Sequence, residues 1–115
     1  MTPEEAREHW IALVELQPTT REARGLVPVG AYAYVVAKAD SAPEFEAAVK
    51  RAASAQGFEA AEFDEVEVVN DRWLEGRLGR ELYNVALEAV NEQRPAFGTF
   101  YRFTAEDEDS SPSGA

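Results

Sequence analysis

The sequence predicts a single α+β domain in which one β-sheet packs against helices. Between Gly30 and Phe103 two strand-to-helix units follow each other, and each helix has a recognisable start and stop signal. The chain has 115 residues, of which 45% are hydrophobic, so it can bury one core without disulfides. We therefore expect one globular α+β domain over residues 1–104.

The first segment, residues 2–17, fits two structures. Thr2 and Glu5 form a capping box that favours a helix. Further along, apolar residues occupy both the even and the odd positions, so both faces of a strand would be apolar. This pattern favours a strand over residues 10–16 that is buried on both faces. A polar connection over residues 19–25 then leads to a second alternating run, as an antiparallel pair of strands requires. The strand is our prediction, and a helix remains the alternative.

Residues 30–39 are expected to form a central strand, since neither of its faces is polar before Lys38. Ser41 then supplies an N-cap, with Glu44 at the third helical position, so a helix is predicted over residues 42–56. Gly57 follows, and glycine is the usual residue just after a helix.

The next run, residues 59–69, changes phase at Asp64 and Glu65, which predicts either a β-bulge or a break at this point of a third strand. An apolar stripe predicts a second helix over residues 80–93, which Pro95 stops. Residues 97–103 are expected to form the last strand.

This order of elements predicts one sheet of about four strands with both helices on one face, an α/β sandwich of ferredoxin-like character. Residues 105–115 are acidic and contain no large apolar residue that could anchor them. We expect them to form a disordered tail.

The charge of the chain excludes some partners. Its 22 acidic and 11 basic residues give a net charge of −11, which repels phosphate backbones and anionic lipid. We therefore expect no binding to nucleic acid or membranes. No apolar run approaches the length of a membrane span, the first eight residues are acidic rather than leader-like, and cysteine is absent, so the expected location is the cytoplasm. The basic residues are nearly all arginine, and alanine is abundant, which suggests a GC-rich bacterial genome.

The densest charged feature is an acidic cluster around the third strand. Glu65 and Glu67 would project from one face of that strand and could share a divalent cation. Acids on an edge strand also keep it from pairing with other sheets, which is the simpler interpretation. The third interpretation, a partner-binding surface, is the functional one that we favour. The cluster consists of Glu59, Glu62, Asp64, Glu65, Glu67 and Asp71.

The segment 71–80, before the second helix, combines arginines, a tryptophan and two glycines. Arg72 and Arg77 could bind an anion at the helix start, although the glycine spacing matches no phosphate-binding motif and ion pairs with nearby acids are the simpler interpretation. Trp73 is either an interface residue or a residue that packs over the edge of the core.

Other residue types give little chemistry. His9 is the only histidine and is expected at the surface, and the familiar nucleophile, triad and zinc constellations lack their residues. No catalytic residue, metal site or cofactor is predicted. Tyr32 and Tyr34 share a strand face, which is either covered by helices or open.

Two functional hypotheses follow. In size and acidity the chain resembles the immunity and inhibitor proteins that block toxic nucleases, which implies a non-enzymatic module that binds a basic protein. The candidate binding residues are Glu62, Asp64, Glu65, Glu67, Arg72, Trp73 and Arg77. The alternative is a small-ligand-binding or enzymatic ferredoxin-like homodimer, with a pocket on the open sheet face around Tyr32, Tyr34 and Tyr101.

Overall fold

The computed structural model describes residues 1–103, so the predicted tail over residues 105–115 lies outside the described residues. None of the helices in this described part is long and apolar enough to cross a membrane. In chain order the elements are α1 (Pro3–Glu8), β1 (His9–Pro18), α2 (Arg21–Leu26), β2 (Gly30–Lys38), α3 (Ala42–Ala55), β3 (Phe58–Val68), α4 (Val69–Leu74), α5 (Arg80–Glu92), β4 (Ala96–Phe97) and β5 (Tyr101–Phe103).

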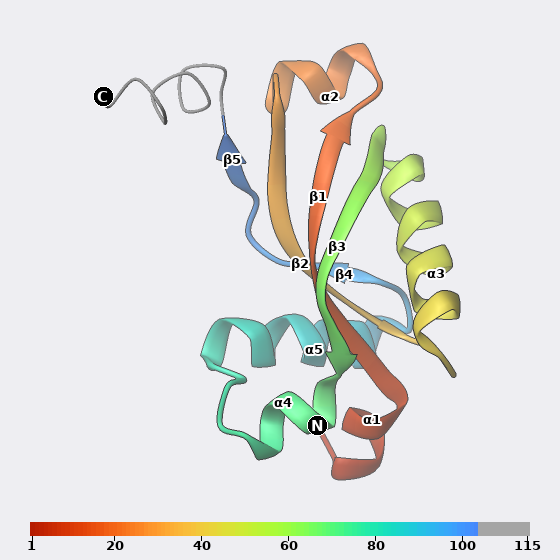
Figure 1. Cartoon of the computed structure of the whole chain (residues 1–115), viewed down its shortest axis with the longest axis vertical. Coiled ribbons are helices and arrows are strands. Elements are labelled where there is room, and N and C mark those ends of the chain that lie inside the picture. Colours follow the sequence, from red (N-terminus) through yellow and green to blue (C-terminus); the bar gives the residue numbers. More distant parts are fainter. Residues whose placement is uncertain (104–115) are drawn as a thin grey trace.

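The strands form one antiparallel sheet in the order β3-β1-β2-β4, and β5 also pairs with β2 (Figure 1). The α+β class with ferredoxin-like character is confirmed. The predicted strands and helices over residues 10–16, 30–39, 59–69, 42–56 and 80–93 agree with β1, β2, β3, α3 and α5 to within two residues at each end.

Both signals in the first segment have a counterpart in the structure. The capping box of Thr2 and Glu5 starts the six-residue helix α1, and the alternating run forms β1 immediately after it. The polar connection contains α2, whose N-cap is Thr20. The predicted antiparallel pairing of β1 with β2 is confirmed.

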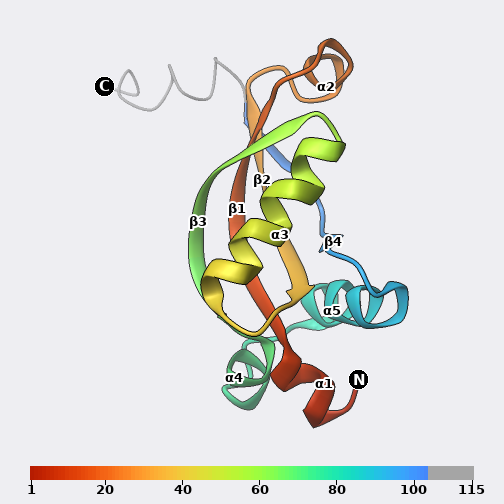
Figure 2. The same ribbon diagram turned by 90° about the vertical axis from the view of Figure 1, so that its right-hand side faces the viewer.

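The helices α3 and α5 pack on opposite faces of the sheet, so the placement of both on one face is corrected (Figures 1 and 2). Neighbouring strand residues point to opposite faces. Val35 belongs to the core under α3, whereas Val36 belongs to the core under α5. Since β1 and β2 are apolar on both faces, each face requires its own cover, and the two long helices provide one each.

Of the bulge or break predicted at Asp64 and Glu65, the structure shows the bulge, within one continuous strand β3. Ile11 pairs with Glu67 and Leu13 with Asp64, so β3 has one extra residue there, and Glu65 has a left-handed φ of 55°. A second register shift lies between the partners of Glu15 and Leu16. These shifts keep the apolar residues of β3 directed towards the α3 core despite their irregular spacing; these residues are Phe58, Ala60, Phe63 and Val66.

The prediction of one continuous last strand over residues 97–103 was wrong, because the structure divides this segment into β4 and β5. Phe97 and Phe100 both pack against the α3 core, although they are three residues apart. A regular strand would place them on opposite faces, so the chain leaves the ladder between them. Gly98 marks this point, where its N–H donates to the carbonyl oxygen of Tyr34 at 2.8 Å.

Gly57 ends α3 in a conformation that should tolerate no other residue. Its φ is +86°, and a Cβ at this position would lie 2.5 Å from Oγ1 of Thr20, the N-cap of α2. A left-handed conformation alone costs an alanine about 1–2 kcal/mol. Because the Cβ would also clash with Thr20, Gly57→Ala should reduce the free energy of unfolding by more than this amount. Chemical denaturation would measure the change.

Alanine substitutions at two other glycines separate the conformational cost from the clash with Thr20. Gly76→Ala adds a Cβ at a φ of +72° but with nothing within 4 Å, so it should show the conformational cost only. Gly25→Ala, in α2 with open space around it, should be neutral or stabilising. Equal losses for Gly57→Ala and Gly76→Ala would contradict the importance of the Thr20 contact.

Candidate functional site

A buried arginine organises the charged residues between β3 and α5. Only 4% of Arg72 is exposed. Its guanidinium donates from Nε to Oε2 of Glu67 and from Nη2 to Oε1 of Glu65, each at 3.0 Å. The bulge gives β3 the extra residue at the point where these two carboxylates meet Arg72. Two of the predicted site acids are therefore paired with a buried arginine of the same chain.

Arg77 extends this group into a network that we call the Arg72 cluster, comprising Arg72, Glu65, Glu67, Arg77 and Glu75. The Nη2 atom of Arg77 donates to Oε1 of Glu67 at 2.7 Å and also to Glu75. The hydrogen bonds from Arg77, together with the charge of Arg72, lower the pKa of Glu67. The arginines predicted as an anion site are thus engaged by carboxylates of the same chain.

Aromatic residues support the cluster from the sheet and the helices. The Arg72 guanidinium carbon lies 5.4 Å from the ring centroid of Tyr34, in cation–π contact. Trp73 is half-buried and packs edge-to-face on Tyr83, with ring centroids 6.0 Å apart. Trp73 therefore packs at the edge of the α5 core, while the adjacent Leu74 is 79% exposed.

The two other predicted acids, Glu62 and Asp64, lie on a part of the α5-side sheet face where Tyr32 and Tyr101 are also exposed. In the strand register, Glu62 of β3 is opposite Glu15 of β1, Glu15 is opposite Tyr32 of β2, and Tyr32 is opposite Tyr101 of β5. One row thus crosses four strands. With Asp64, these residues form what we call the carboxylate–tyrosine face, comprising Glu15, Glu62, Asp64, Tyr32 and Tyr101.

The electrostatics of this face are unfavourable to the isolated fold. Glu15 and Glu62 are like charges directly opposite each other on neighbouring strands, an arrangement that destabilises a sheet. The negative charge of Glu15 is the main cause that raises the pKa of Tyr32, and burial, Glu62 and Asp64 add to it. Among the described basic side chains, none forms an ion pair with Glu15, Glu62 or Asp64. The face could accept positive charge.

Glu15 was not among the candidate binding residues, and Tyr101 was named only for the alternative pocket on the open sheet face. Glu15 is the only charged residue inside the predicted strand 10–16, and this is the sequence signal that could have found it. Its neighbours across the sheet depend on strand pairing. Tyr101 is positioned by α5, since its hydroxyl donates to Glu81 at 2.9 Å. This hydrogen bond raises the pKa of Tyr101 and, with one from Thr99, lowers that of Glu81.

His9 is buried, contrary to the expected surface position. It is 5% exposed and lies at the junction of α1 and β1, where its Nδ1 donates to the carbonyl oxygen of Glu5 at 2.8 Å. The C-terminal end of α5, with Ala89 and Val90, lies beside His9 on this face of the sheet. Within residues 1–103, no group of three or more histidine, aspartate or glutamate side chains is arranged to hold a metal ion.

Removal of the Arg72 charge should destabilise the fold strongly. Arg72→Met leaves Glu65 and Glu67 without their buried counter-charge, so the free energy of unfolding should fall by about 2–4 kcal/mol. Arg77→Gln is the matched control, because the Arg77 side chain is 44% exposed and solvent screens its ion pairs, so its loss should be clearly smaller. Urea denaturation would compare the two, and equal losses would contradict a central role for Arg72.

The lowered pKa of Glu67 predicts acid sensitivity. The folded protein binds a proton at Glu67 less readily than the unfolded chain, whose ordinary value is 4.5. The stabilisation is therefore complete above that pH and is lost as the pH falls through the lower folded value. Denaturation at pH 7, 5 and 3.5 should show a smaller acid-induced loss for Glu67→Gln than for the wild type. Parallel pH profiles would contradict this assignment.

Comparisons with protein-family models, with curated proteins and with solved structures found no match to this chain.

Proposed function

We propose that this protein is a non-enzymatic module that binds a basic surface of another protein through the carboxylate–tyrosine face. The mode of action would be that of an immunity or inhibitor protein, in which an acidic surface covers a basic site on its target. The single observation that carries the proposal is the row of residues across four strands, in which two opposed glutamates are followed by two exposed tyrosines.

The opposed glutamates support this proposal because they cost the free protein stability. Like charges directly opposite each other on a sheet are destabilising, and glutamine at either position would avoid the cost without changing the size of the side chain. A cation from a partner placed between Glu15 and Glu62 would remove the repulsion. Acids placed only for solubility would not require this cross-strand pairing.

The tyrosines support a protein partner that carries arginine. Tyr32 and Tyr101 are 36% and 47% exposed, and aromatic rings provide contact area at little entropic cost. A guanidinium can stack on an aromatic ring while it donates to a carboxylate, and Tyr34 with Arg72 and Glu67 exemplifies this combination within the same sheet. An arginine from a partner could make equivalent contacts at Tyr32 and Glu15.

The second candidate is a small-ligand pocket on the same open face, which the exposed tyrosine pair favours. With so many carboxylates nearby, such a ligand would be a cation. A homodimer through this face is the less favourable arrangement, because it would bring Glu15, Glu62 and Asp64 of two copies together.

The deciding experiment compares two variants of equal net charge. The face variant carries Glu15→Gln, Glu62→Gln and Asp64→Asn, and the control variant carries Glu8→Gln, Asp40→Asn and Glu44→Gln, all at exposed positions on other elements. Each tagged protein captures partners from host lysate at low salt, and a salt gradient elutes them for identification. We expect a basic protein that the wild type and the control retain, and that the face variant binds about tenfold more weakly.

Stability provides an independent readout of the same change. The face variant should be at least as stable as the wild type, because loss of the Glu15–Glu62 repulsion contributes a few tenths of a kcal/mol. Weaker binding in a variant of equal or greater stability would support a binding role. Equal capture by the face variant and the control would contradict the proposal, and a thermal shift with a small polyamine but no captured protein would favour the second candidate.

A further inference from the structure

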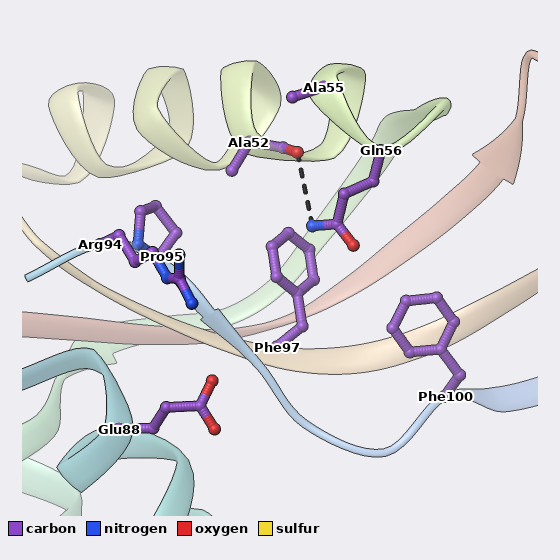
Figure 3. Close-up of a pocket in the computed structure, with 8 residues that line it drawn as sticks. All are labelled: Ala52, Ala55, Gln56, Glu88, Arg94, Pro95, Phe97 and Phe100. Carbon is purple, nitrogen blue, oxygen red and sulfur yellow. Dashed lines mark hydrogen bonds between the residues drawn. The ribbon is translucent and has the colours of Figure 1, made fainter. Parts of the chain in front are cut away.

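A groove lies on the other side of the molecule, where the C-terminal half of α3 faces the segment from Arg94 to Phe100 (Figure 3). Its volume is about 620 Å³, enough for a small organic molecule. We call it the aromatic groove, and its lining comprises Ala52, Ala55, Gln56, Glu88, Arg94, Pro95, Phe97 and Phe100. None of these residues belongs to the carboxylate–tyrosine face.

One part of the groove is apolar and held in place by the core. The rings of Phe97 and Phe100 lie 6.5 Å apart, and Phe100 packs edge-to-face on Phe58 with centroids 5.6 Å apart. Both are half-buried and pack against the α3 core. Because the break between β4 and β5 places both rings on this side of the sheet, an apolar surface exists there before any ligand arrives.

Another part of the groove carries one positive and one negative side chain. Arg94 approaches from the turn after α5, and Glu88 comes from α5 itself (Figure 3). The Arg94 pair with Glu92 at 3.3 Å is solvent-exposed and therefore weak, so the guanidinium can turn to another acceptor. The hydrogen bond from Gln56 to the Ala52 carbonyl uses its Nε2, which leaves Oε1 as an acceptor beside the rings.

The apolar part and the charged part of the groove together indicate which charges a ligand should carry. A simple anion is disfavoured by the net charge of −11 and by Glu88. A simple cation would be repelled by Arg94 and attracted equally by acids elsewhere. A molecule with adjacent positive and negative groups and an apolar side chain satisfies Arg94, Glu88 and the phenylalanine rings together.

We propose that the aromatic groove binds a free α-amino acid with an aromatic or large aliphatic side chain. The α-carboxylate accepts from Arg94, the α-ammonium donates to Glu88, and the side chain lies on Phe97 and Phe100. This site is separate from the proposed protein-binding face, so either proposal can fail without the other.

The test is a titration with L-phenylalanine, followed by the amide NMR signals of the ¹⁵N-labelled protein. We expect saturable shifts at Gln56, Gly98 and Phe100, with a dissociation constant in the millimolar range of about 1–10 mM, as befits a shallow site. Two analogues test the charges: N-acetyl-L-phenylalanine keeps only the negative charge, and L-phenylalaninamide keeps only the positive charge. Each should bind about fivefold more weakly than L-phenylalanine, or more weakly still.

Variants of the lining residues test which side chains bind the two charges of the amino acid. Arg94→Gln and Glu88→Gln should each weaken L-phenylalanine binding about fivefold, whereas Arg51→Gln, at an exposed position of α3 outside the lining, should not. Phe100→Leu keeps the core apolar and should weaken binding by removal of one ring. The proposal is overturned by the absence of saturable shifts up to about 20 mM, by equal binding of the three ligands, or by unchanged affinity in Arg94→Gln and Glu88→Gln.

Discussion

The buried guanidinium of Arg72 is the constraint on which this end of the structure depends. A charge that is almost fully removed from water is tolerated only when counter-charges and hydrogen bonds surround it, and here Glu65, Glu67 and the ring of Tyr34 provide them. Arg72 is in α4, whereas its partners are in β3 and β2. One side chain thus fixes how the end of β3, the following helix and the centre of the sheet meet.

This constraint divides the acidic residues of β3 into two groups. The bulge at Glu65 accompanies the pairing of Glu65 and Glu67 with Arg72, whereas Glu62 and Asp64, just before it, have no such partner among the described basic residues. The first group stabilises the fold, as its lowered Glu67 pKa reflects. The second group, with Glu15, is a source of repulsion, and its negative charge lies beside Tyr32.

The lengths and directions of the two long helices decide which surfaces stay open. Figures 1 and 2 show α3 running lengthwise along the sheet, whereas α5 lies across the strands near one end. Because α5 lies across the strands, it covers only about its own diameter of 10–12 Å along the roughly 36 Å of the 11-residue β3. The part of the sheet that α5 does not cover carries the carboxylate–tyrosine face. On the opposite face, α3 forms one wall of the aromatic groove.

The sequence by itself determined the α+β class, the principal strands and helices and the position of the irregularity in β3, because these follow from local signals: side-chain periodicity, the caps at Thr2 and Ser41, and the phase change at Asp64 and Glu65. Only the tertiary structure decided that α3 and α5 lie on opposite faces, since periodicity identifies a two-sided strand but not which helix covers each side. The same holds for the acids. Glutamates only three and five residues apart became a neighbour of Glu15, at Glu62, or partners of the buried Arg72, at Glu65 and Glu67, through strand register, which residue types and spacing do not encode.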